Sequence, residues 1–298
     1  MERRMTARNS IKRRIRARMS KTGESYSTAR RAILRASSQE DVSTAMSMNI
    51  VLAQPPRRTG DLEQDIETMF VGDTNPLCDL LVLPELIGAN SEPDQYTRTI
   101  RSLARRFGCY VVGGSSYRPG SDGVVNAGIV VDSQGQTVTR YEKLRPYGSE
   151  IDAGISSGTK IGQFDLRGRS FAVMICSDLW FSETIASLGC HPDVLLIPSF
   201  SITQRGDPEK ARQLWKHMLV ARAYEYSAYV GVCDWAHPCE FEGLRASGVS
   251  GFADPRPNGE SFFEGNGNRR VVSYELDFDR LDSFRENRVS RGFSTRLE

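Results

Sequence analysis

FAVMICSD, from Phe171 to Asp178, is an apolar run that ends in a cysteine and an aspartate. Such a run is typical of a strand buried on both faces, and Cys176 lies at its end. LLVLPEL (80–86) places Glu85 just past a second apolar run, and RYEKLRPYGSE (140–150) carries Lys143 just past a third. In open α/β sheets, ligands gather at the carboxyl ends of strands. We therefore expect Glu85, Lys143 and Cys176 to meet at one site.

On both sides of these segments, short apolar strands alternate with helical patterns. The sequence predicts strands at 49–54, 80–83, 110–117, 171–175, 194–197, 229–233, 247–253 and 270–277, helices at 61–70, 92–107 and 208–226, and a hairpin joining 126–131 to 137–141. Strands buried on both faces with helices between them indicate a layered α/β domain.

The composition is that of an ordinary globular protein, with 39% apolar and 26% charged residues among 298. No apolar run approaches the roughly 20 residues that a membrane-spanning helix needs. No apolar segment of a secretory signal follows the basic start of the chain. The six cysteines lack paired spacing, which indicates reduced thiols rather than a disulfide framework. We therefore expect a cytoplasmic protein with no membrane contact.

The first 47 residues differ in charge from the rest of the chain. They hold 12 Lys/Arg against 4 Asp/Glu, whereas the whole chain has a net charge of only +2. We interpret 1–47 as a basic N-terminal extension, helical or disordered, and 48–298 as the globular domain. We interpret this extension, called the arm below, as a solvated tail. Its alternatives are a segment that binds nucleic acid or another anionic partner, and a presequence, which Glu2 and the TGESY break argue against.

A thiol, a cation and a carboxylate together can carry out acyl transfer. The thiol attacks, the cation stabilises the oxyanion and the carboxylate moves protons. A helix predicted to begin at Ser177 or Asp178 would lower the pKa of the Cys176 thiol from about 8.5 toward neutrality. The alternatives for single residues are a buried structural cysteine, an acidic strand end at Glu85 and a surface lysine at Lys143.

Six segments, in order along residues 48–290, resemble the nitrilase, or carbon–nitrogen hydrolase, superfamily. Three of them are the LVLPEL, YEKLRPYGSE and VMICSDLWFSE segments that hold the candidate residues; the others are NIVLAQPPRRTGDLEQDI, WKHMLVARAYEYSAYVGVCDW and SGVSGFADPRPNGE. The resemblance implies a four-layer αββα sandwich. It also implies a homodimer or higher homo-oligomer.

The same resemblance implies a role for each residue of the site. Cys176 is then the nucleophile, Glu85 the general base and acid, and Lys143 the oxyanion stabiliser. Glu150 matches a second carboxylate near the lysine, and the backbone N–H of Ser177 is the other oxyanion donor. The segment after Ile197 lies where the family shapes its substrate pocket, and the pocket residues expected here are Tyr147, Ser199 and Phe200.

The reaction implied is hydrolysis of a non-peptide C–N bond, in an amide or an N-carbamoyl group, through a cysteine thioester that releases ammonia or an amine. Hydrolysis of a nitrile to an acid in the same fold is the alternative. The chemistry needs no cofactor and no metal, and the spacing of Cys233, His237 and Cys239 matches no standard zinc site. Ser177 stands where relatives often have an aromatic residue, so the identity of the substrate stays open.

Overall fold

The computed structural model describes residues 46–70, 77–189, 191–202, 207–256 and 270–293. Contacts between Cα atoms group Ser47–Glu298 into one compact unit. Nearly all of the basic arm predicted at 1–47 lies outside the described residues. Within the part described, no helix is both long and apolar enough to cross a membrane.

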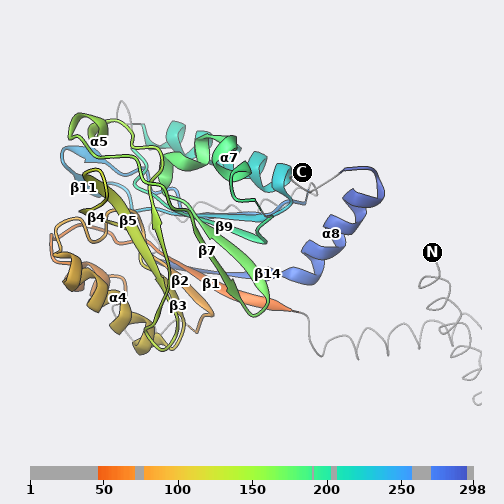
Figure 1. Cartoon of the computed structure of the whole chain (residues 1–298), viewed down its shortest axis with the longest axis horizontal. Helices are drawn as coiled ribbons and strands as arrows, with labels where there is room; N and C mark the ends of the chain where they lie inside the picture. Colours follow the sequence, from red (N-terminus) through yellow and green to blue (C-terminus); the bar gives the residue numbers. More distant parts are fainter. Residues whose placement is uncertain (1–45, 71–76, 190, 203–206, 257–269, 294–298) are drawn as a thin grey trace, which may run out of the picture. The chain divides into compact units, whose positions relative to one another are not determined.

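The first sheet contains the strand that leads to Glu85 and the strand that leads to Lys143. Its order is β14-β1-β2-β3-β5-β4, with β6 also paired to β5 (Figure 1). β1, β2 and β3 run parallel, and the other pairs are antiparallel. The strands are β1 (Ser47–Ala53), β2 (Leu80–Val82), β3 (Tyr110–Val112), β4 (Ser116–Pro119), β5 (Val124–Val131), β6 (Thr137–Glu142) and β14 (Val271–Asp277).

The second sheet contains the strand that leads to Cys176. Its order is β13-β10-β9-β8-β7, with β8, β9 and β10 parallel. These strands are β7 (Gly162–Leu166), β8 (Arg169–Val173), β9 (Val194–Pro198), β10 (Tyr229–Cys233) and β13 (Gly251–Ala253). A short ribbon of β11 (Glu240–Phe241) and β12 (Leu244–Arg245) stands apart from both sheets.

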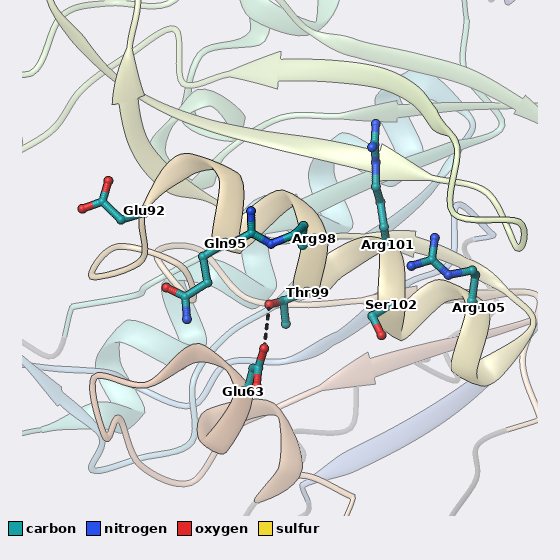
Figure 2. Close-up of a pocket in the computed structure, with 8 residues that line it drawn as sticks. All are labelled: Glu63, Glu92, Gln95, Arg98, Thr99, Arg101, Ser102 and Arg105. Carbon is teal, nitrogen blue, oxygen red and sulfur yellow. Dashed lines mark hydrogen bonds between the residues drawn. The ribbon is translucent and has the colours of Figure 1, made fainter.

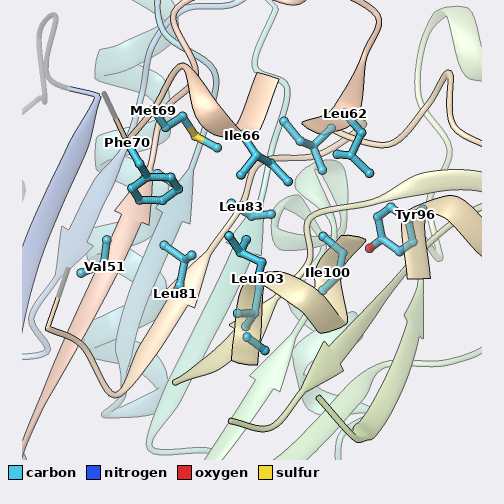
Figure 3. Packing of buried hydrophobic residues seen from close by; sticks show 14 of the residues in the cluster. Val51, Leu62, Ile66, Met69, Phe70, Leu81, Leu83, Tyr96, Ile100 and Leu103 are labelled. Atoms are coloured by element: carbon cyan, nitrogen blue, oxygen red, sulfur yellow. The ribbon is translucent and has the colours of Figure 1, made fainter. Parts of the chain in front are cut away.

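Helices cover the outer faces of the two sheets, with α4 (Pro93–Phe107) on one side and α7 (Pro208–Tyr226) on the other (Figure 1). Beside α4 lies α3 (Leu62–Glu67), which begins after Asp61, whose carboxylate caps two backbone N–H groups. The apolar faces of α3 and α4 pack on alternate side chains of β1 and β2 (Figure 3). The remaining helices are α5 (Ser149–Asp152), the 3₁₀ helix η1 (Cys176–Trp180), α6 (Ser182–Ala186) and α8 (Phe278–Ser290).

The two sheets face one another through the other alternate side chains of their central strands. Val51 and Leu81 point to the α3–α4 side, so Ile50 and Leu52 on β1 point to the opposite face of the sheet and are fully buried there. Cys233 at the end of β10 donates its thiol hydrogen to the carbonyl oxygens of Ala53 and Val82, in the first sheet. Two facing sheets between two helical layers confirm the predicted four-layer αββα sandwich.

Most predicted elements are present, and α7 and β10 have the predicted bounds. The strand predicted at 110–117 is wrong as a single element, because the backbone turns between β3 and β4. Gly114 lies there at φ +64°, and a Cβ on it would lie 2.1 Å from the carbonyl oxygen of Pro84. The pattern of the sequence also missed β7 and α8. Both are largely polar along one face, so neither forms a continuous apolar run.

Candidate active site

The three candidate residues follow the ends of three strands, as the sequence predicts. Glu85 lies three residues past the end of β2, Lys143 comes directly after β6, and Cys176 lies three residues past β8. Cys176 has φ +48°, a conformation that non-glycine residues adopt only when surrounding structure holds them there. This turn directs the thiol out of the strand and into a pocket.

Lys143 lies between two carboxylates in an almost completely buried cluster. Its Nζ donates to Glu85 Oε1 at 2.7 Å and to Glu150 Oε2 at 2.5 Å. The side chains of Lys143, Glu85 and Glu150 are 4%, 2% and 6% exposed. A buried cation between two anions keeps a fixed geometry, because any departure leaves a charge unpaired. The structure therefore brings the predicted supporting residue Glu150 to the site.

Asn126 on β5 links the two carboxylates and was not predicted. Its Nδ2 donates to Glu85 Oε1 at 2.9 Å and to Glu150 Oε1 at 2.8 Å. It is fully buried, as a single polar side chain within the apolar strand VVNAGIVV. That interruption is the one signal in the sequence from which a site residue on this strand could have been inferred.

The second oxygen of Glu85 is held by the segment that follows β9. The backbone N–H of Phe200 donates to Glu85 Oε2 at 2.7 Å, and the Cys176 thiol donates to the Phe200 carbonyl with an Sγ–O distance of 4.0 Å. The indole N–H of Trp235 donates to the Glu85 backbone carbonyl at 2.7 Å. Glu85 is thus positioned at both its backbone and its side chain.

Burial and neighbouring charge control the protonation of the cluster. Burial raises the pKa of Glu85 above its usual value, although Lys143 opposes the rise. Burial would lower the pKa of Lys143, but the charges of Glu85 and Glu150 outweigh it and raise the pKa well above the ordinary range. These directions favour the charged form of Lys143 and make Glu85 a stronger base than a carboxylate in water.

The predicted low pKa of the Cys176 thiol is wrong for this structure. Burial raises the thiol pKa well above its usual value, and the charge of Glu85 raises it further, against the attraction of Lys143. The helix that begins at Cys176 is the five-residue 3₁₀ helix η1, which offers no long macrodipole. The thiol therefore rests protonated and needs an adjacent base to react.

Asp178 joins the lysine loop to the cysteine turn and is a further residue whose role was not predicted. Its buried carboxylate accepts the backbone N–H groups of Leu144 at 3.1 Å, Arg145 at 2.8 Å and Ile175 at 3.1 Å. Beside it, the Ser177 hydroxyl donates to the Arg145 carbonyl at 2.6 Å. These bonds fix the position of Lys143 relative to Cys176. Burial raises the pKa of Asp178 to about 6, against these hydrogen bonds.

Cys176 opens into a pocket of about 580 Å³ whose walls are mostly apolar. Its lining consists of Tyr147, Cys176, Ser177, Trp180, Phe200, Ser201, Ile202, Asp207, Lys210, Ala211, Leu214 and Trp215. Of the predicted pocket residues, Tyr147 and Phe200 are brought to it. Ser199 is not in the lining: it is fully buried, and its hydroxyl donates to the Ile197 carbonyl at 3.2 Å.

A second groove, of about 690 Å³, runs along α4 and is unrelated to the cluster. Figure 2 shows its arginines Arg98, Arg101 and Arg105 spaced along the helix, and the hydrogen bond from Thr99 to Glu63. The oxygen atoms of that bond are 3.3 Å apart. None of the candidate site residues lines it. Among the residues that the structure describes, no group of three or more His, Cys, Asp or Glu side chains could hold a metal ion.

Comparison with solved structures supports the fold independently of sequence. The yeast Nit3 structure, from Saccharomyces cerevisiae, superposes with a TM-score of 0.67 at 23% identity, covering 81% of this chain and 94% of that one. An amidase from Nesterenkonia sp. gives a TM-score of 0.61 at 22% identity, covering 83% and 96%. At these identities the agreement establishes the fold.

Comparison with the sequences of known proteins agrees with the comparison of folds. The omega-amidase NIT3 of Saccharomyces cerevisiae is 27% identical over 65% of this chain and 68% of its own length. The 2-oxoglutaramate amidase of Bacillus subtilis is 28% identical over 73% of this chain and 85% of its own length. The family profile for carbon–nitrogen hydrolases matches residues 54–286, which include every candidate residue described above. The chain belongs to the carbon–nitrogen hydrolase family.

Proposed function

We propose that this protein hydrolyses the C–N bond of a small-molecule amide, with Cys176 as nucleophile, Glu85 as general base and acid, and Lys143 as oxyanion stabiliser. The observation that carries the proposal is the buried Glu85–Lys143–Glu150 cluster beside a cysteine that opens into a pocket. The amidase relatives support an amide as the bond cleaved, in preference to an N-carbamoyl group.

The first half of the reaction forms a thioester. Glu85 accepts the proton of the Cys176 thiol, and the sulfur attacks the carbonyl carbon of the amide. The ammonium of Lys143 and the backbone N–H of Ser177 stabilise the negative charge that develops on the carbonyl oxygen. Glu85 then donates its proton to the nitrogen, the C–N bond breaks, and ammonia leaves.

The second half returns the enzyme to its starting state. Glu85, again a carboxylate, takes a proton from a water molecule that attacks the thioester carbon. The carbon–sulfur bond breaks, the acid leaves, and Cys176 regains a proton from Glu85. Glu150 touches no reacting atom in this scheme: it shares Lys143 and Asn126 with Glu85 and so positions both.

The direct test measures ammonia release from a panel of amides, N-carbamoyl amines and nitriles. We expect release from amides by the parent protein and none by Cys176→Ala, with the fold of the variant checked by circular dichroism. Release by Cys176→Ala at the parent rate would disprove the assignment. Release from nitriles alone would move the activity to the nitrile alternative.

Two further expectations remain part of the proposal. We propose a homo-oligomer that associates through exposed apolar side chains of α7 and of the junction between η1 and α6. Among them are Phe181, Val220 and Tyr224. A monomer in light scattering at micromolar concentration would contradict it.

We also propose that the arm 1–47 is a separate cationic segment of a cytoplasmic protein. DNA binding that weakens with salt and disappears on deletion of 1–46 would give it a binding role.

A further inference from the structure

One wall of the pocket is a run of three aromatic side chains, each in contact with the next. The rings of Tyr147 and Trp180 are stacked, with centroids 6.3 Å apart and planes at 26°. The rings of Trp180 and Trp215 meet edge to face at 6.0 Å and 84°. We call these three residues the aromatic wall. All three line the pocket that holds Cys176.

The aromatic wall leads from the interior to the surface. Trp215 is 3% exposed, Trp180 is 40% exposed and Tyr147 is 51% exposed. Exposed rings of this size, arranged side by side at the mouth of a cavity, leave apolar faces uncovered, and a flat apolar group placed on them would remove those faces from water. Phe200 and Leu214 extend the apolar surface of the same pocket.

Charge in the described lining is sparse and lies at the rim. Apart from the cysteine, the ionisable groups there are Asp207, Lys210 and the phenol of Tyr147. The Lys210 ammonium lies 3.9 Å from the Asp207 carboxylate, and the Lys210 side chain is 86% exposed. Lys210, the cation of the described lining, is thus exposed and paired, so a carboxylate placed against the aromatic wall would lose its hydration without a buried partner from that lining, which is costly.

We propose that the aromatic wall is the acyl subsite and that it selects amides with an uncharged, flat or branched apolar acyl group over monoamides of dicarboxylic acids. The inference rests on the proposed function, because it names the substrate class of the same site. It sets this protein apart from the 2-oxoglutaramate amidase relative, whose named substrate carries a carboxylate. Trp180, which contacts both of the other rings, is the specificity-determining residue.

The first experiment compares kcat/KM for benzamide, phenylacetamide and isobutyramide with kcat/KM for succinamate and glutaramate. We expect the best of the uncharged amides to exceed both monoamides by at least about tenfold, the discrimination that an apolar pocket commonly supplies. A higher kcat/KM for succinamate or glutaramate would overturn the inference while leaving the proposed amidase activity intact.

Variants then assign the selectivity to the wall. Trp180→Ala is expected to lower the ratio of kcat/KM for benzamide over glutaramate by about tenfold, chiefly through KM, and Trp180→Phe to restore most of it. Phe293→Ala is the matched control, since Phe293 is an exposed aromatic residue outside the pocket lining. An unchanged ratio in Trp180→Ala would remove Trp180 from the subsite.

A binding measurement separates failure of this inference from failure of the proposed function. Calorimetric titration of Cys176→Ala with benzamide and with glutaramate measures the affinity of the subsite for each amide without turnover. Tighter binding of benzamide supports the aromatic wall even if the parent protein releases no ammonia. Tighter binding of glutaramate contradicts the inference, whatever the activity.

Discussion

Cys176 and Cys233 are both cysteines whose thiol pKa burial raises well above the usual value, yet of the two only Cys176 lines the pocket. Cys233 lies between the sheets, where its thiol donates to the carbonyls of Ala53 and Val82 at 3.1 and 3.2 Å. Cys176 lies beside a buried carboxylate and a buried ammonium, at the opening of a pocket. The difference supports the proposal that reactivity at Cys176 comes from an adjacent base and a fixed cation, because neither thiol is ionised at rest.

The largest expected effect is the difference in kcat between alanine substitutions at the two cysteines. Cys176→Ala removes the nucleophile, so kcat should fall by at least about 10³-fold with little change in stability. Cys233→Ala should keep kcat within about threefold and lower the unfolding free energy by about 1 kcal/mol. Steady-state ammonia release and denaturant unfolding measure the two quantities. Loss of activity in Cys233→Ala with an unchanged fold would contradict the claim that Cys233 takes no part in the reaction.

Removing the base should make Cys176 resemble Cys233. Glu85→Gln preserves the shape of the side chain but cannot accept the thiol proton, so we expect kcat to fall by about 10³-fold. Alkylation by iodoacetamide, mapped by peptide mass spectrometry, should also slow at Cys176 and remain absent at Cys233 in the folded protein. If Glu85→Gln labels at the parent rate, another group activates the thiol.

Removing the cation tests the buried cluster itself. Lys143→Met leaves Glu85 and Glu150 without their shared partner, and we expect a stability loss of about 3–5 kcal/mol and a kcat loss of about 10²-fold. The stability loss should be larger at pH 8 than at pH 5, because burial raises the pKa of Glu85 and its protonation toward pH 5 removes one of the unpaired charges. The control is Arg106→Met, which removes the exposed Arg106–Glu67 pair and should cost about 0–1 kcal/mol. Equal costs in the two variants would contradict the account.

A smaller effect is expected from the carboxylate that holds the cysteine turn. Because the pKa of Asp178 is about 6, acidification below that value protonates an acceptor of three backbone N–H groups, and kcat should fall. Asp178→Asn should lower kcat about tenfold near pH 8 with little change in KM, and should weaken the dependence of kcat on pH between 5 and 7. A change confined to KM would show that Asp178 does not position the reacting groups.

The raised pKa of Asp178 affects stability and kcat in opposite directions as the pH changes. The folded pKa lies above the ordinary value of 3.8, so folding favours the protonated form of Asp178. Its contribution to stability is therefore full below pH 3.8 and is lost as the pH rises through about 6. Activity and this part of the stability should thus move in opposite directions over pH 4–6, which unfolding of Asp178→Asn at both ends of the range can check.

The sequence predicted those parts of the fold and site that local pattern determines. Apolar runs located the strands before Glu85 and Cys176, and the long helical segment that begins at Pro208 gave the bounds of α7. Asn126 and Asp178 were missed as site residues because their roles depend on partners 41 and 34 residues away along the chain. The direction of the thiol pKa was wrong because burial depends on tertiary packing, which no local helix signal reports.

The central claim is that amide hydrolysis passes through an acyl group on Cys176. The most direct measurement is acid quenching during turnover of a saturating amide, followed by intact-mass and peptide mass spectrometry. The account predicts an adduct with the mass of the acyl group on the peptide that contains Cys176, and none in Cys176→Ala. Steady turnover with the acyl group on another residue, or undiminished turnover in Cys176→Ala, would contradict it.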